Sequence, residues 1–122
     1  MNIKTSTAEK QIANLLKVLG SPFRIKLLLS IGQGEACVCH LEAVLKKRQA
    51  YISQHLMILR DAGILKTRRD GKYIYYRVAD KSVFDLIEST AGMLKISSEK
   101  ILVLSETAIR ENCECPKCDR ET

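Results

Sequence analysis

The segment formed by residues 49–78 constrains the fold most, because its apolar spacing changes from that of a helix to that of a hairpin. Apolar side chains recur every three or four positions at Ile52, Leu56 and Leu59, which is typical of a helix with one buried face. Gly63 then provides a helix stop, since glycine takes the left-handed conformation after a helix C-terminus at no steric cost. A helix followed directly by a short hairpin predicts a winged helix-turn-helix.

The hairpin is predicted from two short segments, Leu65–Arg69 and Tyr73–Val78, which are separated by Asp70-Gly71. An Asp-Gly pair favours a tight turn because both residues tolerate positive φ angles. We therefore expect a two-stranded wing whose turn is centred on Asp70-Gly71.

The opposite face of the predicted helix is polar and suited to DNA, because its side chains can hydrogen-bond base edges or phosphates. Residues 46–81 also hold ten Lys or Arg and only three Asp, a net charge of +7 against +6 for the whole chain. A basic excess confined to one region indicates a polyanion-binding surface. The alternative is a charged face that is merely exposed to solvent. On this helix the predicted DNA contacts are Gln49, Ser53, Gln54, His55 and Arg60.

The rest of the chain is predicted to be mainly helical. The expected fold is α+β with the order α-α-α-α-β-β-α, comprising a winged helix-turn-helix domain at residues 1–112 and a cysteine-rich tail at 113–122. Gly92 and Ser97-Ser98 can bend or interrupt the last helical run. The other predicted helices are 8–19, a helix opened by Ser21-Pro22 that ends near Gly32–Gly34, Val38–Leu45 followed by a turn at 46–48, and a run from Asp80 to about Ala108.

The first and last predicted helices each carry an apolar stripe that one small domain would leave uncovered. We infer that these stripes pair across a two-fold axis to form a homodimer; packing within a single chain is the alternative. A two-fold axis would place two recognition helices about one turn of DNA apart. No segment approaches the roughly 20 apolar residues that span a bilayer, and the N-terminus lacks an apolar signal core. We therefore expect a cytoplasmic protein without a membrane partner.

The five cysteines form two sets. Cys37 and Cys39 lie at the start of a predicted short helix, and two thiols separated by one residue point to the same side if the backbone there is extended. The helix dipole favours the thiolate at this position, but cysteine is also a common small core residue. Core packing explains three cysteines in a polar tail less well. The segment Cys115-Pro-Lys-Cys118 has the spacing of a metal or redox CxxC pair. The tail cysteines are Cys113, Cys115 and Cys118.

The sequence resembles the ArsR/SmtB family of metal-sensing repressors over about residues 10–110. The resemblance rests on ACVCHLE, which is similar to the family's metal-binding box, and on ISQHLMILRDAGILKTRRDGKYIYYRV, which is similar to its recognition helix and wing. It implies a homodimer that binds operator DNA without metal and releases it with metal, and it implies that Cys37 and Cys39 are metal ligands. The DNA-contacting residues that it implies are Ser53, Gln54 and His55 in the major groove, with Arg69, Lys72 and Tyr73 in the wing.

Two departures from the family pattern bear on the bound ion. The family's zinc-type site uses Asp and His on the last helix, but no histidine follows His55. The family's box often has a third cysteine, which is missing from LEAVL here, so we expect the tail to supply it. A site of three or four thiolates suits As(III), Sb(III), Cd(II) or Pb(II), with Zn(II) a poorer match. His40 is expected to be partly exposed, with a ligand role as the alternative.

These features predict a DNA-binding repressor that releases its operator when a thiophilic ion binds the cysteines. One alternative is a redox- or persulfide-sensing repressor of the same fold, in which Cys37 or Cys39 forms a disulfide with a tail cysteine. Another is a winged-helix regulator with incidental cysteines. We do not expect an enzyme, because the chain has no glycine-rich phosphate loop, no HExxH motif and no nucleophile or carboxylate constellation around its two histidines.

Overall fold

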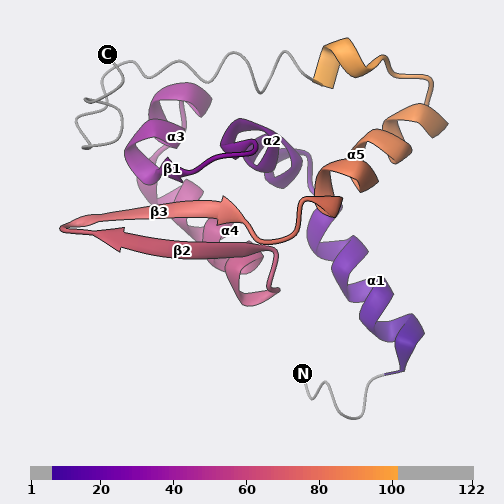
Figure 1. Ribbon diagram of the computed structural model, residues 1–122, viewed down its shortest axis with the longest axis horizontal. Coiled ribbons are helices and arrows are strands. Elements are labelled where there is room, and N and C mark those ends of the chain that lie inside the picture. The colour runs from indigo at the N-terminus through magenta and orange to yellow at the C-terminus, as the bar shows by residue number, and fades with distance from the viewer. Residues whose placement is uncertain (1–6, 102–122) are drawn as a thin grey trace.

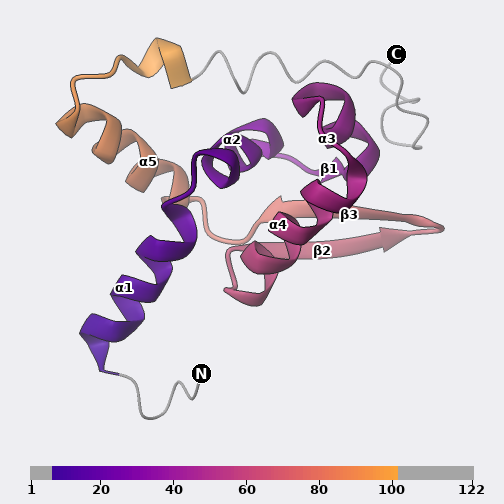
Figure 2. The same cartoon turned by 180° about the vertical axis from the view of Figure 1, so that it is seen from behind.

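The computed structural model describes residues 7–101. In chain order its elements are α1 (Ala8–Leu19), α2 (Pro22–Ile31), β1 (Ala36–Cys37), α3 (Val38–Leu45), α4 (Gln49–Asp61), β2 (Leu65–Asp70), β3 (Tyr73–Val78) and α5 (Ser82–Met93). Helices α2, α3 and α4 gather on one side of the long β2–β3 hairpin (Figure 1). Seen from behind, α1 and α5 lie at the end of the molecule away from the hairpin tip (Figure 2). The predicted winged helix-turn-helix, mainly helical with a small antiparallel sheet, is confirmed.

The core lies between α2, α4 and the sheet. Leu27 and Leu28 of α2 are completely buried, and so are Ile52, Leu56 and Leu59 of α4. The predicted buried stripe of α4 is therefore confirmed. Burial of one such side chain contributes about 1.5–3 kcal/mol to the stability of the fold. The three buried side chains therefore fix the orientation of α4 about its own axis, and the polar side of the helix faces solvent.

The helix ends follow the capping residues that the sequence predicts. Helix α2 begins at Pro22, and the Ser21 hydroxyl accepts a hydrogen bond from the Arg24 N–H at 3.4 Å, as expected for a serine N-cap followed by proline. Helix α4 is followed by Gly63, whose φ of 81° confirms the glycine stop. Between α3 and α4, Lys46 takes a left-handed φ of 55°, which turns the chain from one helix into the next.

The sheet has three strands in the order β1-β3-β2, and not the two-stranded wing that was predicted. The additional strand pairs Ala36 with Tyr76 and Cys37 with Tyr75. Two residues are too few to show the alternation by which a strand is predicted, so this pairing left no signal in the sequence. Its consequence is that the segment carrying Cys37 is part of the same sheet as the wing.

The hairpin turn lies one residue later than the predicted centre. Asp70 pairs with Tyr73 at the end of the two strands, so Gly71 and Lys72 form the two-residue loop. Gly71 has a φ of 63°, whereas Lys72 is not among the described residues with positive φ. This combination is typical of a type II′ turn, and it places Lys72 at the exposed tip.

The long helical run predicted after the wing is interrupted, as its serines suggested. Helix α5 ends at Met93, Lys95 takes a φ of 62°, and helical structure resumes at residues 98–101. Serine favours a new helix start over continuation, because its hydroxyl competes for backbone hydrogen bonds. The predicted end of the run lies outside the described residues. None of the helices described is long and apolar enough to cross a membrane.

Helices α1 and α5 expose an apolar face. Leu16 is 49% exposed, Leu94 66% and Met93 83%. A cavity of about 330 Å³ opens between α1, α2 and α5, and its lining is almost entirely aliphatic. A large contiguous apolar patch on a small protein marks an interaction site.

Candidate DNA-binding surface and thiol site

Helix α4 presents polar side chains on the sides that face away from the core. Gln49, Gln54 and Arg60 are exposed, and Ser53 is half-buried. Arg60 forms an ion pair with its neighbour Asp61 at 3.2 Å. Because both side chains of this pair are largely exposed, it contributes little to stability, and the guanidinium can exchange its carboxylate for a phosphate. The structure places these residues where the sequence predicted, and their contact with DNA stays a prediction.

His55 lies between two aromatic rings and a guanidinium. Its ring centroid is 5.0 Å from that of Phe23 and 4.7 Å from that of Tyr51. Its Nδ1 lies 3.2 Å from a guanidinium nitrogen of Arg24, and because a guanidinium only donates, Nδ1 accepts and the ring proton is on Nε2. Burial, and then the Arg24 charge, hold the pKa of His55 below its usual value. His55 therefore joins α4 to the start of α2 as a neutral imidazole.

The hairpin tip carries two exposed cations, Arg69 and Lys72. Lys72 Nζ lies 5.5 Å from the centre of the Tyr73 ring, within the range of a cation–π interaction. The Tyr73 ring is half-buried and packs against the cluster formed by Cys37 and Tyr75. The cations are thus suited to phosphate contacts, whereas Tyr73 connects the tip to the thiols.

Cys37 and Cys39 bring two sulfur atoms together at the start of α3. Their Sγ atoms are 2.7 Å apart, with Cys37 buried and Cys39 half-buried. Cys37 is the N-cap of α3, and its Sγ accepts a hydrogen bond from the His40 N–H at 3.4 Å. A helix N-terminus stabilises a thiolate. The predicted convergence of these two thiols is therefore found, in a geometry suited to one shared soft ion or to thiol oxidation.

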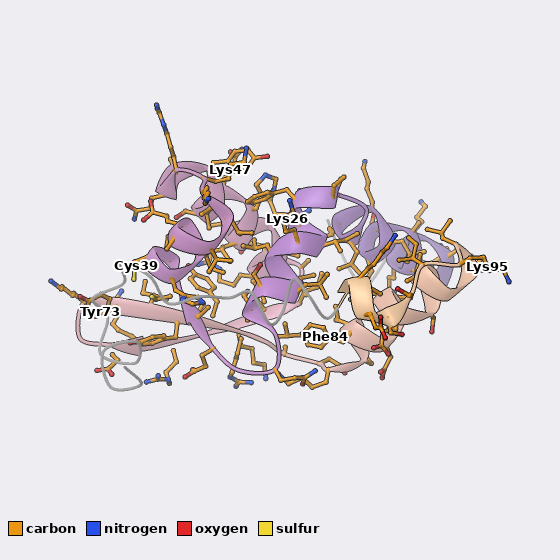
Figure 3. The ribbon with its side chains drawn as sticks, turned by 90° about the horizontal axis from the view of Figure 1, so that it is seen from above. Lys26, Cys39, Lys47, Tyr73, Phe84 and Lys95 are labelled. Carbon is orange, nitrogen blue, oxygen red and sulfur yellow. The ribbon has the colours of Figure 1, made fainter. Side chains whose placement is uncertain are left out.

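The thiol pair opens on a cavity of about 320 Å³ that is lined by residues of β1, α3, α4 and the wing. Figure 3 shows Cys39 and Tyr73 close to one end of the molecule, with Lys95 at the other end. An ion held by the sulfurs would thus lie beside the recognition helix and the wing tip. Residues that line the cavity include Cys39 and Glu42 of α3, Gln49 and Ser53 of α4, and Lys72 and Tyr73 of the wing.

The prediction of a partly exposed His40 is wrong, since this residue is buried with 6% of its surface exposed. Strand β1 ties the segment that leads into α3 to the sheet, so the first turn of α3 is covered. Within residues 7–101, no three Cys, His, Asp or Glu side chains come together as a metal site. The tail cysteines, Cys113, Cys115 and Cys118, lie outside the described residues.

Two residues that the sequence did not single out connect the wing to the loop before the thiols. The guanidinium of Arg68 donates to both carboxylate oxygens of Glu35, each at 2.9 Å, and it lies 4.7 Å from the centre of the Tyr75 ring. The hydrogen bond to Glu35 is the main cause of a raised pKa for Arg68. Nothing in the sequence signals a contact between side chains 33 positions apart.

Comparison with known proteins places this arrangement in a family. The model of the bacterial regulatory proteins of the arsR family matches residues 21–67. The biofilm growth-associated repressor of Agrobacterium fabrum is 47% identical over 91 residues, which cover 75% of this chain and 78% of that protein. The arsenical resistance operon repressor of Escherichia coli is 31% identical over 100 residues, which cover 81% of this chain and 86% of that protein.

Solved structures agree with the sequence relatives. The transcriptional repressor BigR from Xylella fastidiosa superimposes with a TM-score of 0.62 at 36% identity, covering 68% of this chain and 85% of that chain. These relatives are named as repressors, and not as enzymes. The chain therefore belongs to the ArsR/SmtB family of winged helix-turn-helix transcriptional repressors.

Proposed function

We propose that this protein is a homodimeric, cytoplasmic repressor that releases operator DNA when a thiophilic ion binds Cys37 and Cys39. The observation that carries the proposal is the pair of sulfur atoms 2.7 Å apart beside a cavity shared with α4 and the wing. Paired thiolates favour soft ions, As(III) and Sb(III) or Cd(II) and Pb(II), over hard ions such as Mg(II). Zn(II) ranks behind them, because the zinc-type site of the family takes histidine from the last helix and no histidine follows His55.

The remaining donors of the site are proposed to be tail cysteines, from the same subunit or from its partner. Three sulfurs suit As(III) and three or four suit Cd(II) or Pb(II), whereas Cys37 and Cys39 offer two. One relative is named an arsenical resistance operon repressor, which supports arsenite as the effector. The thiolate donors alone suit Cd(II) and Pb(II) equally well. The proposed additional ligands are Cys113, Cys115 and Cys118.

Release is proposed to follow from the position of the thiols next to the DNA-binding elements. An ion that draws α3 and the tail into one arrangement shifts the wall of the shared cavity, to which Gln49 and Lys72 also contribute. Two recognition helices held at the wrong spacing then fit DNA poorly. A coupling free energy of about 3 kcal/mol would weaken operator binding roughly a hundredfold.

The direct test is a titration of the reduced, full-length protein on a fluorescent operator duplex, selected from random DNA by the protein itself. Anisotropy is followed while arsenite, Cd(II), Pb(II) or Zn(II) is added, with Mg(II) as the hard-ion control. We expect release with arsenite, Cd(II) or Pb(II) and none with Mg(II). Retention of DNA at saturating arsenite, Cd(II) and Pb(II) would exclude the proposed effector class.

Two variants locate the ligands. Cys39→Ser removes one soft donor with little change in size, so we expect normal DNA binding without ion-dependent release. A chain ending before Cys113 should lose the response or shift it to much higher ion concentrations. If the shortened protein releases DNA at the same ion concentration as the full chain, the tail supplies no ligand.

A thiol-redox or persulfide response is the second candidate, and the same sulfur–sulfur distance supports it. Two thiols that become one disulfide release two electrons and two protons to an oxidant. The two functions are distinguished after mild peroxide treatment, with and without bound Cd(II). Mass spectrometry detects the disulfide, and anisotropy on the operator duplex detects release of DNA. A redox sensor loses DNA on forming a disulfide without any metal, whereas a metal sensor keeps DNA until the ion is added.

A further inference from the structure

A continuous row of side chains crosses the sheet from the thiol site to the outer wing strand. Cys37 of β1 is paired with Tyr75 of β3, and Tyr75 is paired with Arg68 of β2. Directly paired residues in antiparallel strands place their side chains on the same face. The buried Tyr75 ring therefore lies between the sensor thiol and the Arg68 guanidinium.

Glu35 connects the two ends of this row through an ion pair. It lies two residues before Cys37 and accepts both hydrogen bonds of the Arg68 fork at 2.9 Å. Its side chain is 20% exposed, against 49% for Arg68. The outer strand β2, which has no contact with Cys37 through the backbone ladder, is thus held to the sensor segment by side chains.

The geometry of this pair differs from that of an ordinary surface ion pair. Arg60 and Asp61 are neighbours in sequence, and the arginine contacts a single carboxylate oxygen. Arg68 instead binds both oxygens of Glu35 and lies 4.7 Å from the Tyr75 ring centre. A planar fork held by two parallel hydrogen bonds and an aromatic face has a defined orientation, so it can transmit a displacement.

We propose that the Glu35–Arg68 ion pair, seated on Tyr75, is the positioning link through which ligand binding at Cys37 moves the wing. The inference rests on the proposed function, because it concerns how that same thiol site is coupled to DNA. Neither residue contacts the ion or the operator in this scheme. Their part is to make β1 and β2 move together.

The displacement to be transmitted follows from coordination geometry. An ion bound by both sulfurs fixes the position of Cys37 relative to Cys39, because each metal has its own bond lengths and angles to sulfur. Cys37 is both the last residue of β1 and the N-cap of α3, so its movement shifts the strand, and the ion pair passes that shift to β2.

The test measures coupling, defined as the ratio of operator Kd values with and without saturating Cd(II) or arsenite. The full-length wild type is compared with Glu35→Gln, Arg68→Lys and the double variant E35Q/R68K. We expect a ratio of about one hundred for the wild type and a fall to about ten or less in each single variant, with no further fall in the double variant, because both residues act through one ion pair. The cadmium–thiolate absorbance should still report ion binding in all of them. By linkage, the effect of DNA on ion affinity should fall by the same factor.

Glu88→Gln is the matched control, because it removes one carboxylate from an exposed position of α5. It should keep the wild-type ratio and thereby account for the change in net charge. Single variants that keep the wild-type ratio, or a double variant that loses the sum of the two single losses, overturn the link. A wild type that binds Cd(II) and arsenite but keeps its operator overturns the proposed function and the link together.

Discussion

At the scale of single residues, His55 combines aromatic packing with two ring nitrogens that have different hydrogen-bonding roles. Its ring fills the space between Phe23 and Tyr51, while Nδ1 accepts from Arg24. Its Nε2–H is then the donor that remains for another partner. A protonated ring would lose the Arg24 hydrogen bond and place two cations together, so the neutral state belongs to the folded protein.

The stability of the protein should consequently fall as pH falls through the ordinary histidine range. The pKa of His55 is lowered in the fold, so the unfolded chain binds more protons below about pH 6.5 and gains stability relative to the fold. Urea unfolding between pH 7.5 and 5 checks this, with His55→Gln as the comparison. We expect the variant to lose part of the pH dependence. An NMR titration that gives His55 a pKa above 6.5 would contradict the assignment.

Base-contacting and phosphate-contacting residues should differ in their effect on specificity. Gln54→Ala removes an exposed amide of α4 and should lower operator affinity by about 1–3 kcal/mol while leaving random DNA unaffected. Lys72→Ala at the wing tip should weaken binding to all sequences and reduce the salt dependence of Kd. Anisotropy with both duplexes at several salt concentrations separates the two. Equal losses on operator and random DNA for Gln54→Ala would remove it from the base contacts.

At the scale of elements, short-range sequence patterns predicted the features that depend on residues close together in the chain. The buried face of α4 repeats at helical spacing, Gly63 marks its end, and the CxC spacing predicted two converging thiols. Strand β1 and the Glu35–Arg68 pair depend instead on how the hairpin folds back over a distant loop, since Glu35 lies 33 positions from Arg68 and Ala36 pairs with Tyr76. No short-range pattern carries such information, so the nearness of the thiols to the wing could be seen only in three dimensions.

The wing turn offers a test of backbone conformation alone. Gly71 has a φ of 63°, and a Cβ added there would meet no atom within 4 Å, so Gly71→Ala adds strain without a clash. We expect a loss of about 1 kcal/mol in the free energy of unfolding. Gly34→Ala is the control, since its added Cβ also meets no atom within 4 Å and the residue lacks a positive φ. Urea unfolding at one protein concentration should show the control unchanged or slightly stabilised, and equal losses in both would refute the turn argument.

At the scale of the whole molecule, the exposed apolar face of α1 and α5 bears on DNA binding, because a dimer formed through it would set the distance between two copies of α4. Helices α1 and α5 lie at the end away from the wing tip (Figures 1 and 2). A two-fold axis through that face would leave both wings pointing outward. Two half-sites one helical turn apart require two recognition helices held at that spacing. Self-association through α1 and α5 would therefore cover the apolar face and set the spacing of the recognition helices in one step.

Leu94→Arg should break this association. Leu94 is 66% exposed in a single chain and lines the cavity between α1, α2 and α5, so a two-fold interface would bury the new charge twice. Met57→Arg is the control, because Met57 is 50% exposed but lies on α4 and outside that cavity. Sedimentation should show a dimer for the wild type and the control and a monomer for Leu94→Arg. The monomer should also bind a two-half-site operator far more weakly, since it can fill only one half-site at a time. A Leu94→Arg protein that sediments as a dimer would place the interface elsewhere on the molecule.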